Sequence, residues 1–259
     1  MRLFGLIGYP LSHSFSEKYF TEKFRRENIT DAAYRLFPLE DLQQLPALLE
    51  ANPELCGLNV TIPHKEKVIA FLDGLDETAK AVGAVNTIRI QRTPNTEHGT
   101  RNFFLRGYNT DVYGFRQSLK PFLASHHERA LILGTGGASK AVEYVLRNIG
   151  VECIFVSREK KNLPSKTVLT YEELNQYVIA ACKLIVNTSP VGTFPDVQAA
   201  PSIPYEFITA DHFLYDLVYN PAETEFLKRG KAKGALVLNG YDMLKLQAEK
   251  AWEIFNQKI

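Results

Sequence analysis

Short apolar runs alternate with amphipathic stretches along almost the whole chain, and this alternation constrains the fold more than any other feature. The strand-like runs of the first part lie at residues 3–8, 32–38, 57–62 and 84–90. Helix-like stretches lie between them at 16–28 and 39–52. Because strands separated by helices pair through crossover connections, we expect a mostly parallel sheet covered by helices. A hairpin is the exception, with strands on either side of the turn-rich segment 93–102.

The pattern restarts near Asp111 with a helix-like stretch at 112–123. Further strand-like runs follow at 130–134, 153–157, 183–190, 212–219 and 234–240, and a helix pattern covers 241–255. The sequence therefore predicts an α/β fold of two domains. We place the first at 1–111, joined by a C-terminal helical segment at 238–259, and the second at 112–237.

Composition excludes several function classes. The chain has 259 residues, of which 45% are hydrophobic and 23% charged, and its net charge of +1 offers no overall attraction to nucleic acid or a membrane. No apolar run reaches the roughly 18 residues that a membrane helix needs. Three cysteines far apart in the sequence argue against a disulfide framework or a zinc site, so we expect a metal-free protein of the reducing cytoplasm. The oligomeric state is not readable from the sequence.

A glycine-rich turn carries the first functional signal. Gly134, Gly136, Gly137 and Ala138 follow a predicted strand and open a predicted helix. Glycine permits the tight turn and the close approach of a pyrophosphate, and the helix N-terminus stabilises its negative charge. The turn therefore indicates a dinucleotide site. The alternative is a glycine-rich strand-to-helix turn that binds nothing.

The end of the next predicted strand bears on the choice between NAD and NADP. An NAD site has an acidic residue there for the ribose 2′-hydroxyl. This chain has Ser157 and Arg158, followed by Lys160 and Lys161. A guanidinium can hold a 2′-phosphate through two hydrogen bonds, so NADP is the predicted cofactor. Glu159 opposes this preference, and Arg158 alone could be a solvated surface charge.

A second signal is the stretch NVTIPHK at 59–65. Pro63 cannot continue a central strand and restricts the residue before it, so the following side chains lie at the carboxyl end of the strand. Ligands bind at that end of open α/β sheets. Taken alone, Lys65 is more often a surface lysine than a catalytic group.

Several further motifs occur together with this one. They are Ser12-His13-Ser14-Phe15-Ser16, Gly57-x-Asn59-Val60-Thr61-x-Pro63-x-Lys65, Val85-Asn86-Thr87, Gly107-Tyr108-Asn109-Thr110-Asp111, Asn187-Thr188-Ser189-Pro190-x-Gly192, Asp216-x-x-Tyr219-Asn220-Pro221-x-x-Thr224 and Gly240-x-x-Met243-Leu244-x-x-Gln247. With these motifs in this order, the chain resembles the shikimate dehydrogenase family, which includes quinate-active members, from residue 5 to about 250.

The resemblance implies a substrate-binding catalytic domain, a Rossmann-like NADP-binding domain and a C-terminal helix that packs back on the first domain. It implies reversible reduction of 3-dehydroshikimate to shikimate, a step of aromatic amino-acid biosynthesis. The implied catalytic pair is Lys65 and Asp111. The implied substrate ligands are Ser14, Ser16, Thr61, Asn86, Tyr219 and Gln247. The implied cofactor residues are Gly134, Gly136, Gly137, Ala138, Ser157, Arg158, Thr188, Ser189, Gly240 and Met243.

Each polar residue also has a purely structural interpretation. Ser14 and Glu17 fit a capping box, and Ser16 could cap the helix itself, although capping explains one serine rather than two. Asp111 could cap a helix that begins at Val112. Gln247 lies on a mostly apolar helix stripe, where a buried amide needs polar partners that a ligand could supply.

The chain departs from the family pattern in three places. The first helix reads Glu17 to Thr21 where the family has proline and then a His-Asn pair, the loop 93–102 is long, and Ser157-Arg158-Glu159 replaces the usual Asn-Arg-Thr. A quinate or quinate/shikimate dehydrogenase that uses NAD is therefore the nearest rival. A non-catalytic metabolite sensor is the rival of another class, and the retention of both Lys65 and Asp111 speaks against it.

Overall fold

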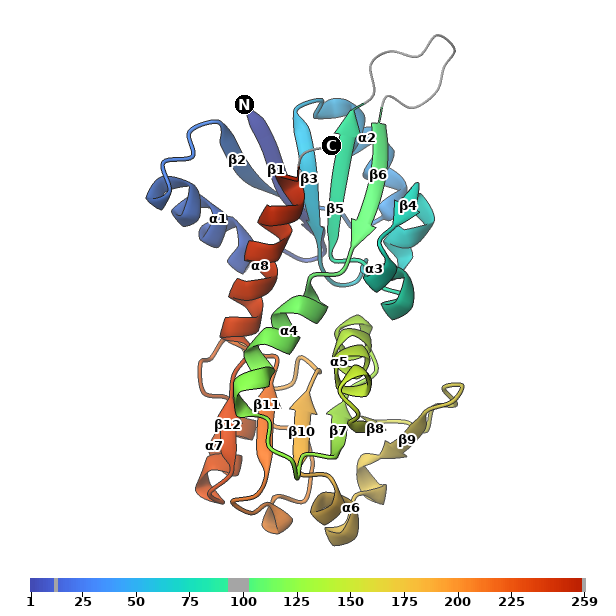
Figure 1. Ribbon diagram of the computed structural model, residues 1–259, viewed down its shortest axis with the longest axis vertical. Helices are drawn as coiled ribbons and strands as arrows, with labels where there is room; N and C mark the ends of the chain where they lie inside the picture. The colour runs from blue at the N-terminus through green and yellow to red at the C-terminus, as the bar shows by residue number, and fades with distance from the viewer. Residues whose placement is uncertain (12–13, 93–102, 258–259) are drawn as a thin grey trace. The chain divides into compact units, whose positions relative to one another are not determined.

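The computed structural model describes residues 1–11, 14–92 and 103–257 (Figure 1). These residues divide into two compact units, one of 1–110 with 248–259 and the other of 111–247. The division falls between Thr110 and Asp111 and again inside the last helix, between Gln247 and Ala248. None of the helices in the described part of the chain is long and apolar enough to cross a membrane.

The first unit is a six-stranded mixed sheet with strand order β2-β1-β3-β5-β6-β4. Strand β1 pairs in parallel with β2 and β3, whereas β5 is antiparallel to both β3 and β6. The hairpin predicted around 93–102 is thus confirmed in its strands, and its loop lies outside the described residues. The elements are β1 (Arg2–Gly8), α1 (Phe15–Arg26), β2 (Ala32–Pro38), α2 (Leu45–Ala51), β3 (Leu55–Val60), β4 (Gly74–Leu75), α3 (Glu77–Val82), β5 (Thr87–Arg92) and β6 (Phe103–Tyr108), with 3-10 turns η1 (Leu42–Gln44) and η2 (Lys67–Phe71).

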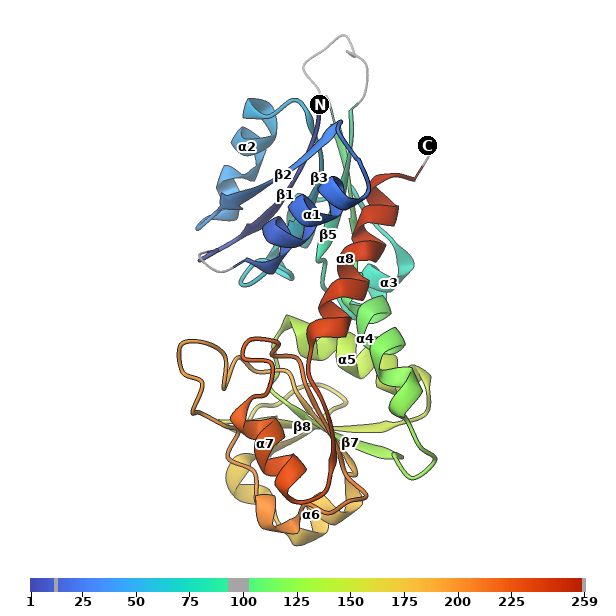
Figure 2. The ribbon, with the colours of Figure 1, turned by 90° about the vertical axis from the view of Figure 1, so that its left-hand side faces the viewer.

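Alternation along β1 explains how both faces of this sheet are buried. Leu3 and Ile7 belong to a hydrophobic cluster that includes α2, whereas Phe4 and Leu6 belong to a second cluster with α1 and the end of the last helix, α8 (Tyr241–Phe255). Successive strand residues point to opposite faces, so one strand supplies both cores. Figure 2 shows α2 on one side of the sheet and α1 with α8 on the other.

The second unit is a six-stranded parallel sheet with strand order β12-β11-β10-β7-β8-β9. Counted along the chain from β7 this is the order 6-5-4-1-2-3 of a doubly wound, Rossmann-like sheet. The elements are α4 (Asp111–Leu119), β7 (Arg129–Leu133), α5 (Gly137–Asn148), β8 (Glu152–Ser157), β9 (Thr167–Thr170), α6 (Gln176–Ala181), β10 (Leu184–Asn187), β11 (Phe213–Asp216), α7 (Glu225–Ala232), β12 (Leu236–Leu238) and α8 (Tyr241–Phe255), with 3-10 turns η3 (Lys120–Phe122), η4 (Tyr171–Glu173) and η5 (Tyr205–Phe207).

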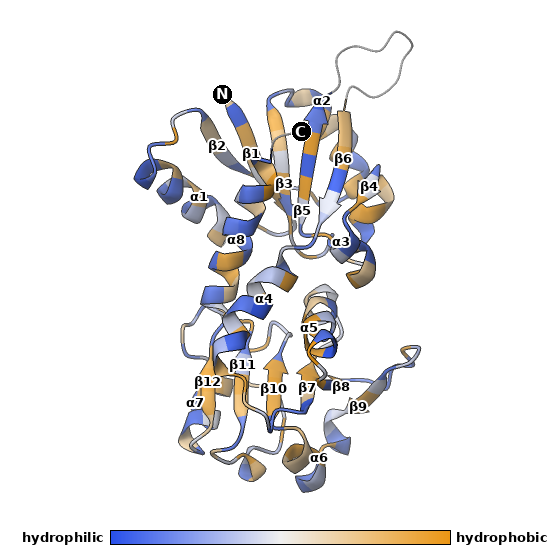
Figure 3. Cartoon of the chain, viewed as in Figure 1, coloured by the Kyte–Doolittle hydropathy of each residue, from blue (hydrophilic) through white to orange (hydrophobic). Residues whose placement is uncertain are grey.

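Helices cover both faces of this sheet. One cluster joins Ile132 and Val186 to residues of α4 and α5, and the other joins Leu133 and Ile185 to α6 and α7. The central strands are therefore apolar on both sides, as Figure 3 shows for β7 and β10. This arrangement leaves the carboxyl ends of the strands as the place for polar side chains.

Candidate active site

Two of the predicted cofactor segments meet at the carboxyl ends of β7 and β10. These strands are neighbours in the sheet, yet the chain leaves β7 toward β8 on one side and reaches β10 on the other. The loop after β10 is tied to the end of β7, because the backbone N–H and the hydroxyl of Thr188 both donate to the Leu133 carbonyl, at 2.9 and 2.8 Å. Doubly wound sheets bind their ligands at such a reversal of strand order.

The glycine-rich turn has the geometry that a pyrophosphate needs. Gly134 has a φ of +110°, and a Cβ there would lie 3.0 Å from the Thr188 hydroxyl. Gly136 precedes α5 in the N-cap position without a side-chain cap, and a Cβ there would meet nothing within 4 Å. Gly137 and Ala138 form the first turn of α5. The helix therefore presents backbone N–H groups beside open space.

Basic residues lie at the end of β8, beside the glycine-rich turn. Ser157 ends the strand and is buried, whereas Arg158 and Glu159 are exposed. Lys160 is paired with Glu173 at 2.6 Å. Lys161 donates a hydrogen bond of 2.8 Å to the hydroxyl of Thr135, inside the glycine-rich turn.

The position of Lys161 was not predicted from the sequence. It was expected only as a neighbouring positive charge, although a lysine four residues after a strand end could have indicated it. Its ammonium lies next to the turn while Lys160 is occupied by a carboxylate.

The loops after β10 and β11 carry Ser189 and Tyr219. Ser189 donates from its backbone N–H and its hydroxyl to Asn187 Oδ1, at 3.1 and 2.7 Å. Tyr219 is half-buried, and burial raises the pKa of its phenol. Gly240 approaches the β11 loop so closely that a Cβ would lie 2.2 Å from the Leu217 carbonyl oxygen, and Met243 is buried in the core of the second unit.

In the first unit, hydrogen bonds fix the loop that carries Thr61 and Lys65. The Thr61 N–H donates to the Ile7 carbonyl at 2.9 Å, and the Lys65 carbonyl accepts from the Val85 N–H at 2.7 Å. Strand β3 ends at Val60 rather than at Ile62, so Thr61 and Lys65 both lie beyond the strand, at its carboxyl end. The side chain of Lys65 is partly exposed.

Ser14 is placed unlike an ordinary helix cap. It occupies the N-cap position of α1, with φ −74° and ψ 124°, but its side chain makes no capping hydrogen bond. Its hydroxyl oxygen is buried and has no hydrogen-bond partner. The capping-box interpretation of Ser14 is therefore wrong, and a buried hydroxyl without a partner costs about 1–3 kcal/mol unless something else meets it.

Ser16 lies inside the first turn of α1, so it does not occupy the cap position. Its hydroxyl meets Tyr34, whose own hydroxyl donates to Asn59 Oδ1 at 2.8 Å. Burial raises the pKa of Tyr34, and the hydrogen bond with Ser16 lowers it by less.

Asn86 has a clear structural role. Its Oδ1 accepts from the Thr110 N–H at 2.7 Å, and its Nδ2 donates to the Thr110 hydroxyl at 2.9 Å. Asn86 is 3% exposed. A substrate hydroxyl at this position would share amide atoms that already hold the strand end before Asp111.

Asp111 and Gln247 belong to the second unit. Helix α4 begins at Asp111 itself, not at Val112, so the carboxylate is the first helical residue. Gln247 is buried on the same face of α8 as Met243 and Ala251, and its Nε2 donates to the Leu244 carbonyl at 2.9 Å. Gly114 lets α4 and α8 pack closely, because a Cβ there would lie 2.5 Å from the Met243 carbonyl oxygen.

Comparison with known proteins adds independent findings. Residues 6–88 match the family model described as the shikimate dehydrogenase substrate binding domain. The chain is 38% identical over 266 residues to a protein of Clostridium beijerinckii named shikimate dehydrogenase (NADP(+)), covering 99% of this chain and 93% of the relative.

Solved structures with this fold include shikimate dehydrogenase 1 from Peptoclostridium difficile, with 36% identity and a TM-score of 0.84 over 100% of this chain and 93% of that one. Quinate dehydrogenase from Corynebacterium glutamicum, solved in complex with NAD, is 28% identical with a TM-score of 0.83, covering 98% of this chain and 93% of that one. Thus both branches anticipated from the sequence motifs are represented among similar structures.

Proposed function

Because the chain belongs to the shikimate dehydrogenase family, we propose that it catalyses the reversible, NADP-dependent reduction of 3-dehydroshikimate to shikimate. This is a hydride transfer to a carbonyl carbon, and it places the protein in the shikimate pathway. We assign substrate binding to the first unit and NADP binding to the second.

The residues of the second unit fit a dinucleotide phosphate. Open space beside Gly136 at the start of α5 suits the pyrophosphate, and Arg158 with Lys161 suits a 2′-phosphate. The loop that carries Thr188 and Ser189, together with Met243 at the start of α8, would hold the nicotinamide end. Bound NADP supplies the hydride in reduction and accepts it in oxidation.

The observation that carries the proposal is the buried Ser14 hydroxyl without a partner. A neutral donor held in a protein suits a carboxylate oxygen, which accepts hydrogen bonds only. The substrate carboxylate would supply the missing partner, with Ser16 beside it. A substrate with a carboxylate would therefore supply the hydrogen-bond partner that Ser14 lacks.

Lys65 and Asp111 carry the proton chemistry in this proposal. As the substrate carbonyl is reduced, negative charge develops on its oxygen, and the Lys65 ammonium donates to that oxygen. We assign to Asp111 the orientation of the substrate hydroxyl. In the oxidation direction the same pair accepts the proton that leaves the hydroxyl.

The test is the absorbance of reduced nicotinamide with shikimate or quinate and NADP+ or NAD+, in all four pairings. We expect turnover with shikimate and NADP+. Turnover with quinate or NAD+ alone would show that Glu159 or the altered first helix has changed specificity. Binding of NADP+ without turnover in any pairing would favour a metabolite sensor.

The same assay with Ser14→Ala tests the substrate end. We expect the KM for shikimate to rise about tenfold or more, the effect of losing one hydrogen bond to a charged group. Ser202→Ala, at an exposed serine of the second unit, is the matched control and should leave KM unchanged. An unchanged KM in Ser14→Ala would remove this serine from the site.

A further inference from the structure

Asp216 is a buried carboxylate that the proposed mechanism does not use. It ends β11, directly opposite Asn187 at the end of β10, and it is 0% exposed. Its Oδ1 accepts from Asn187 Nδ2 at 2.9 Å and from the Val218 N–H at 3.0 Å. Its Oδ2 accepts from the Thr224 hydroxyl at 2.6 Å. Three donors thus converge on one side chain at the carboxyl edge of the sheet.

On one side, Asp216 controls the loop after β10 through Asn187. With its Nδ2 held by Asp216, Asn187 is oriented so that its Oδ1 accepts both hydrogen bonds from Ser189. The Asn187 Nδ2 also reaches the Val191 carbonyl at 3.4 Å. Only one side chain therefore separates the carboxylate from a proposed cofactor residue.

On the other side, Asp216 closes the loop that carries Tyr219. It binds the beginning of this loop at the Val218 N–H and its end at Thr224. Thr224 is fully buried and caps α7, since its hydroxyl oxygen accepts from the Leu227 N–H at 3.4 Å. The Val218 carbonyl in turn accepts from the Gly240 N–H at 3.2 Å.

We propose that Asp216 is a positioning residue, which fixes the loop bearing Ser189 and the loop bearing Tyr219 in one common arrangement and so sets the affinity for NADP. The inference rests on the proposed function for the identity of the ligand. It goes further in joining two loops that the motifs treat separately, through a residue to which the proposed function assigns no ligand contact.

The protonation state of Asp216 affects the same hydrogen bonds. Burial raises the pKa of this carboxyl to about 6, against the lowering effect of Thr224, Val218 and Asn187. Among the described residues, the charge of Asp216 affects the Tyr205 phenol of η5, whose pKa is raised by burial, lowered by Arg229 and raised by Asp216. Arg229 of α7 lies over the Tyr205 ring and is paired with Glu225. A neutral Asp216 has one oxygen fewer to accept hydrogen bonds, so the hydrogen bond from Thr224 is altered at acidic pH.

Asp216→Asn tests the proposal, because asparagine keeps the shape but turns Oδ2 into a donor that cannot accept from Thr224. Direct titration with NADPH should show an affinity about tenfold weaker than wild type at pH 8, the effect of one charge-assisted hydrogen bond. The difference should shrink as the pH falls below 6, where wild-type Asp216 is itself neutral. The 2′-phosphate also titrates near pH 6, so only the difference between the two proteins is compared.

Asp211→Asn makes the same substitution at an exposed aspartate just before β11 and should bind NADPH like wild type. If Asp216→Asn fails to fold, Thr224→Val removes the same hydrogen bond, and Thr224→Ser should restore the affinity. Lower thermal stability of Asp216→Asn with unchanged NADPH affinity at every pH would overturn the proposal. Because binding is read directly, a protein that binds NADPH but does not oxidise shikimate would refute the proposed function without refuting this inference.

Discussion

Lys65 is the single residue on which the proposed chemistry depends most. Its backbone is held by Val85, while its side chain is partly exposed at the carboxyl end of β3. We expect Lys65→Ala to lower kcat about a hundredfold or more, the usual effect of removing a general acid or base. Steady-state rates with shikimate and NADP+ measure this. Lys67→Ala, at an exposed lysine two residues later, should keep its rate, and near wild-type kcat in Lys65→Ala would exclude a catalytic role.

Asp216 also affects the stability of the whole chain. Its pKa is raised from 3.8 to about 6 in the folded protein, so the folded state binds the proton more tightly than the unfolded state. This contribution is fully present below about pH 4 and is lost as the pH rises through 6. A shift of about 2 units corresponds to at most about 3 kcal/mol. Asp216→Asn should remove this term, so the difference in free energy of unfolding between wild type and variant, from urea titrations, should depend on pH between 4 and 6. A difference that is constant over this range would contradict the pKa assignment.

Among single residues, those with backbone roles were predictable and those with hydrogen-bond partners were not. Gly134 follows from the turn that a strand-to-helix connection needs. The sequence left open whether Ser14 caps α1, because a serine at this position fits both a capping box and a ligand-binding hydroxyl. Asp216 and Asn187 were part of motifs, but their contact depends on the register of β10 and β11, which no local pattern contains.

At the scale of elements, the Gly134 turn should be more important for cofactor binding than for folding. Gly134→Ala strains a positive φ and forces the new methyl toward the Thr188 hydroxyl. We expect the KM for NADP+ to rise tenfold or more. Gly150→Ala is a matched control, since Gly150 has a φ of +83° but open space around it, and it should lose about 1 kcal/mol of stability without a change in this KM. Equal effects on KM would argue against a role for the turn.

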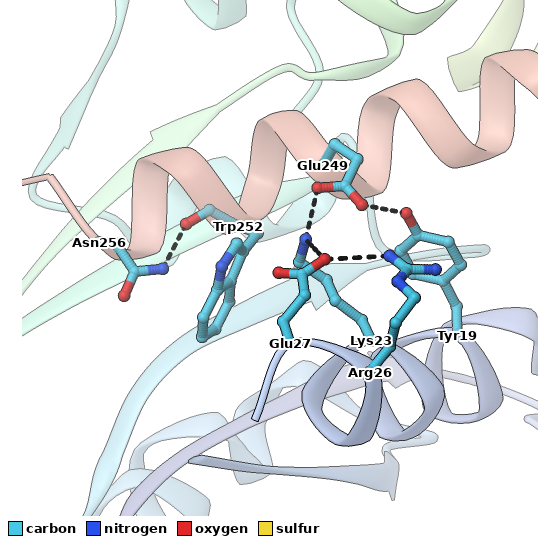
Figure 4. Close-up of polar contacts among 7 residues, drawn as sticks. All are labelled: Tyr19, Lys23, Arg26, Glu27, Glu249, Trp252 and Asn256. Carbon is cyan, nitrogen blue, oxygen red and sulfur yellow. Dashed lines mark hydrogen bonds and ion pairs between the residues drawn. The ribbon is translucent and has the colours of Figure 1, made fainter. Parts of the chain in front are cut away.

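The altered first helix is held by a polar cluster that this chain forms between α1 and α8 (Figure 4). Lys23, 5% exposed, bonds Glu249 at 2.7 Å and Glu27 at 2.9 Å, and the Tyr19 hydroxyl donates to Glu249. Burial together with Glu249 raises the pKa of Tyr19 well above its usual range. Burial lowers the pKa of Lys23, but its bonds to Glu249 and Glu27 outweigh this and leave it raised. Tyr19 also stacks on Phe15, the residue between Ser14 and Ser16, with ring centroids 5.1 Å apart.

Glu249→Gln tests this cluster. It should cost about 1–2 kcal/mol of unfolding free energy, since the buried Lys23 and the half-buried Tyr19 are left with a weaker partner. It should also raise the KM for shikimate, because α1 carries Ser14. Glu253→Gln on the same helix breaks only the exposed pair with Lys250 and should change neither quantity. Thermal melts and the KM for shikimate measure the two effects. Identical behaviour of the two variants would show that the cluster does not stabilise α1 against α8.

Element types were predictable here, whereas boundaries depended on tertiary context. Strand 32–38 and helix 241–255 agree with β2 and α8 at both ends. The run 183–190 shortens to β10, Leu184–Asn187, since Thr188 turns back to bond the end of β7. The stretch 39–52 divides into η1 and α2, where the side chain of Asp41 caps the 3-10 turn and Pro46 lies at the start of α2.

For the whole molecule, the decisive element is α8, because it belongs to both units. Met243 lies in the core of the second unit, whereas Ala251 and Phe255 lie in that of the first. The helix has 15 residues, and either half is too short to be helical by itself in water. Unfolding of one unit should therefore destabilise the half of α8 that completes the other.

The chain has one tryptophan, and it makes this coupling measurable. Trp252 contacts Phe4 and Phe24, at 5.2 and 5.0 Å between ring centroids, so its fluorescence reports on the first unit, whereas NADP+ would bind the second. At a hundredfold excess over its Kd, NADP+ stabilises the state that binds it by about 2.7 kcal/mol. Because α8 is shared, we expect NADP+ to raise the urea midpoint of Trp252 fluorescence together with that of circular dichroism. At the same concentration of NADP+, Gly134→Ala, with binding about tenfold weaker, should show both shifts reduced to about half, because the stabilisation falls to about 1.4 kcal/mol. If only the midpoint from circular dichroism rises and the Trp252 midpoint stays the same, the two units unfold independently and α8 transmits no stability between them.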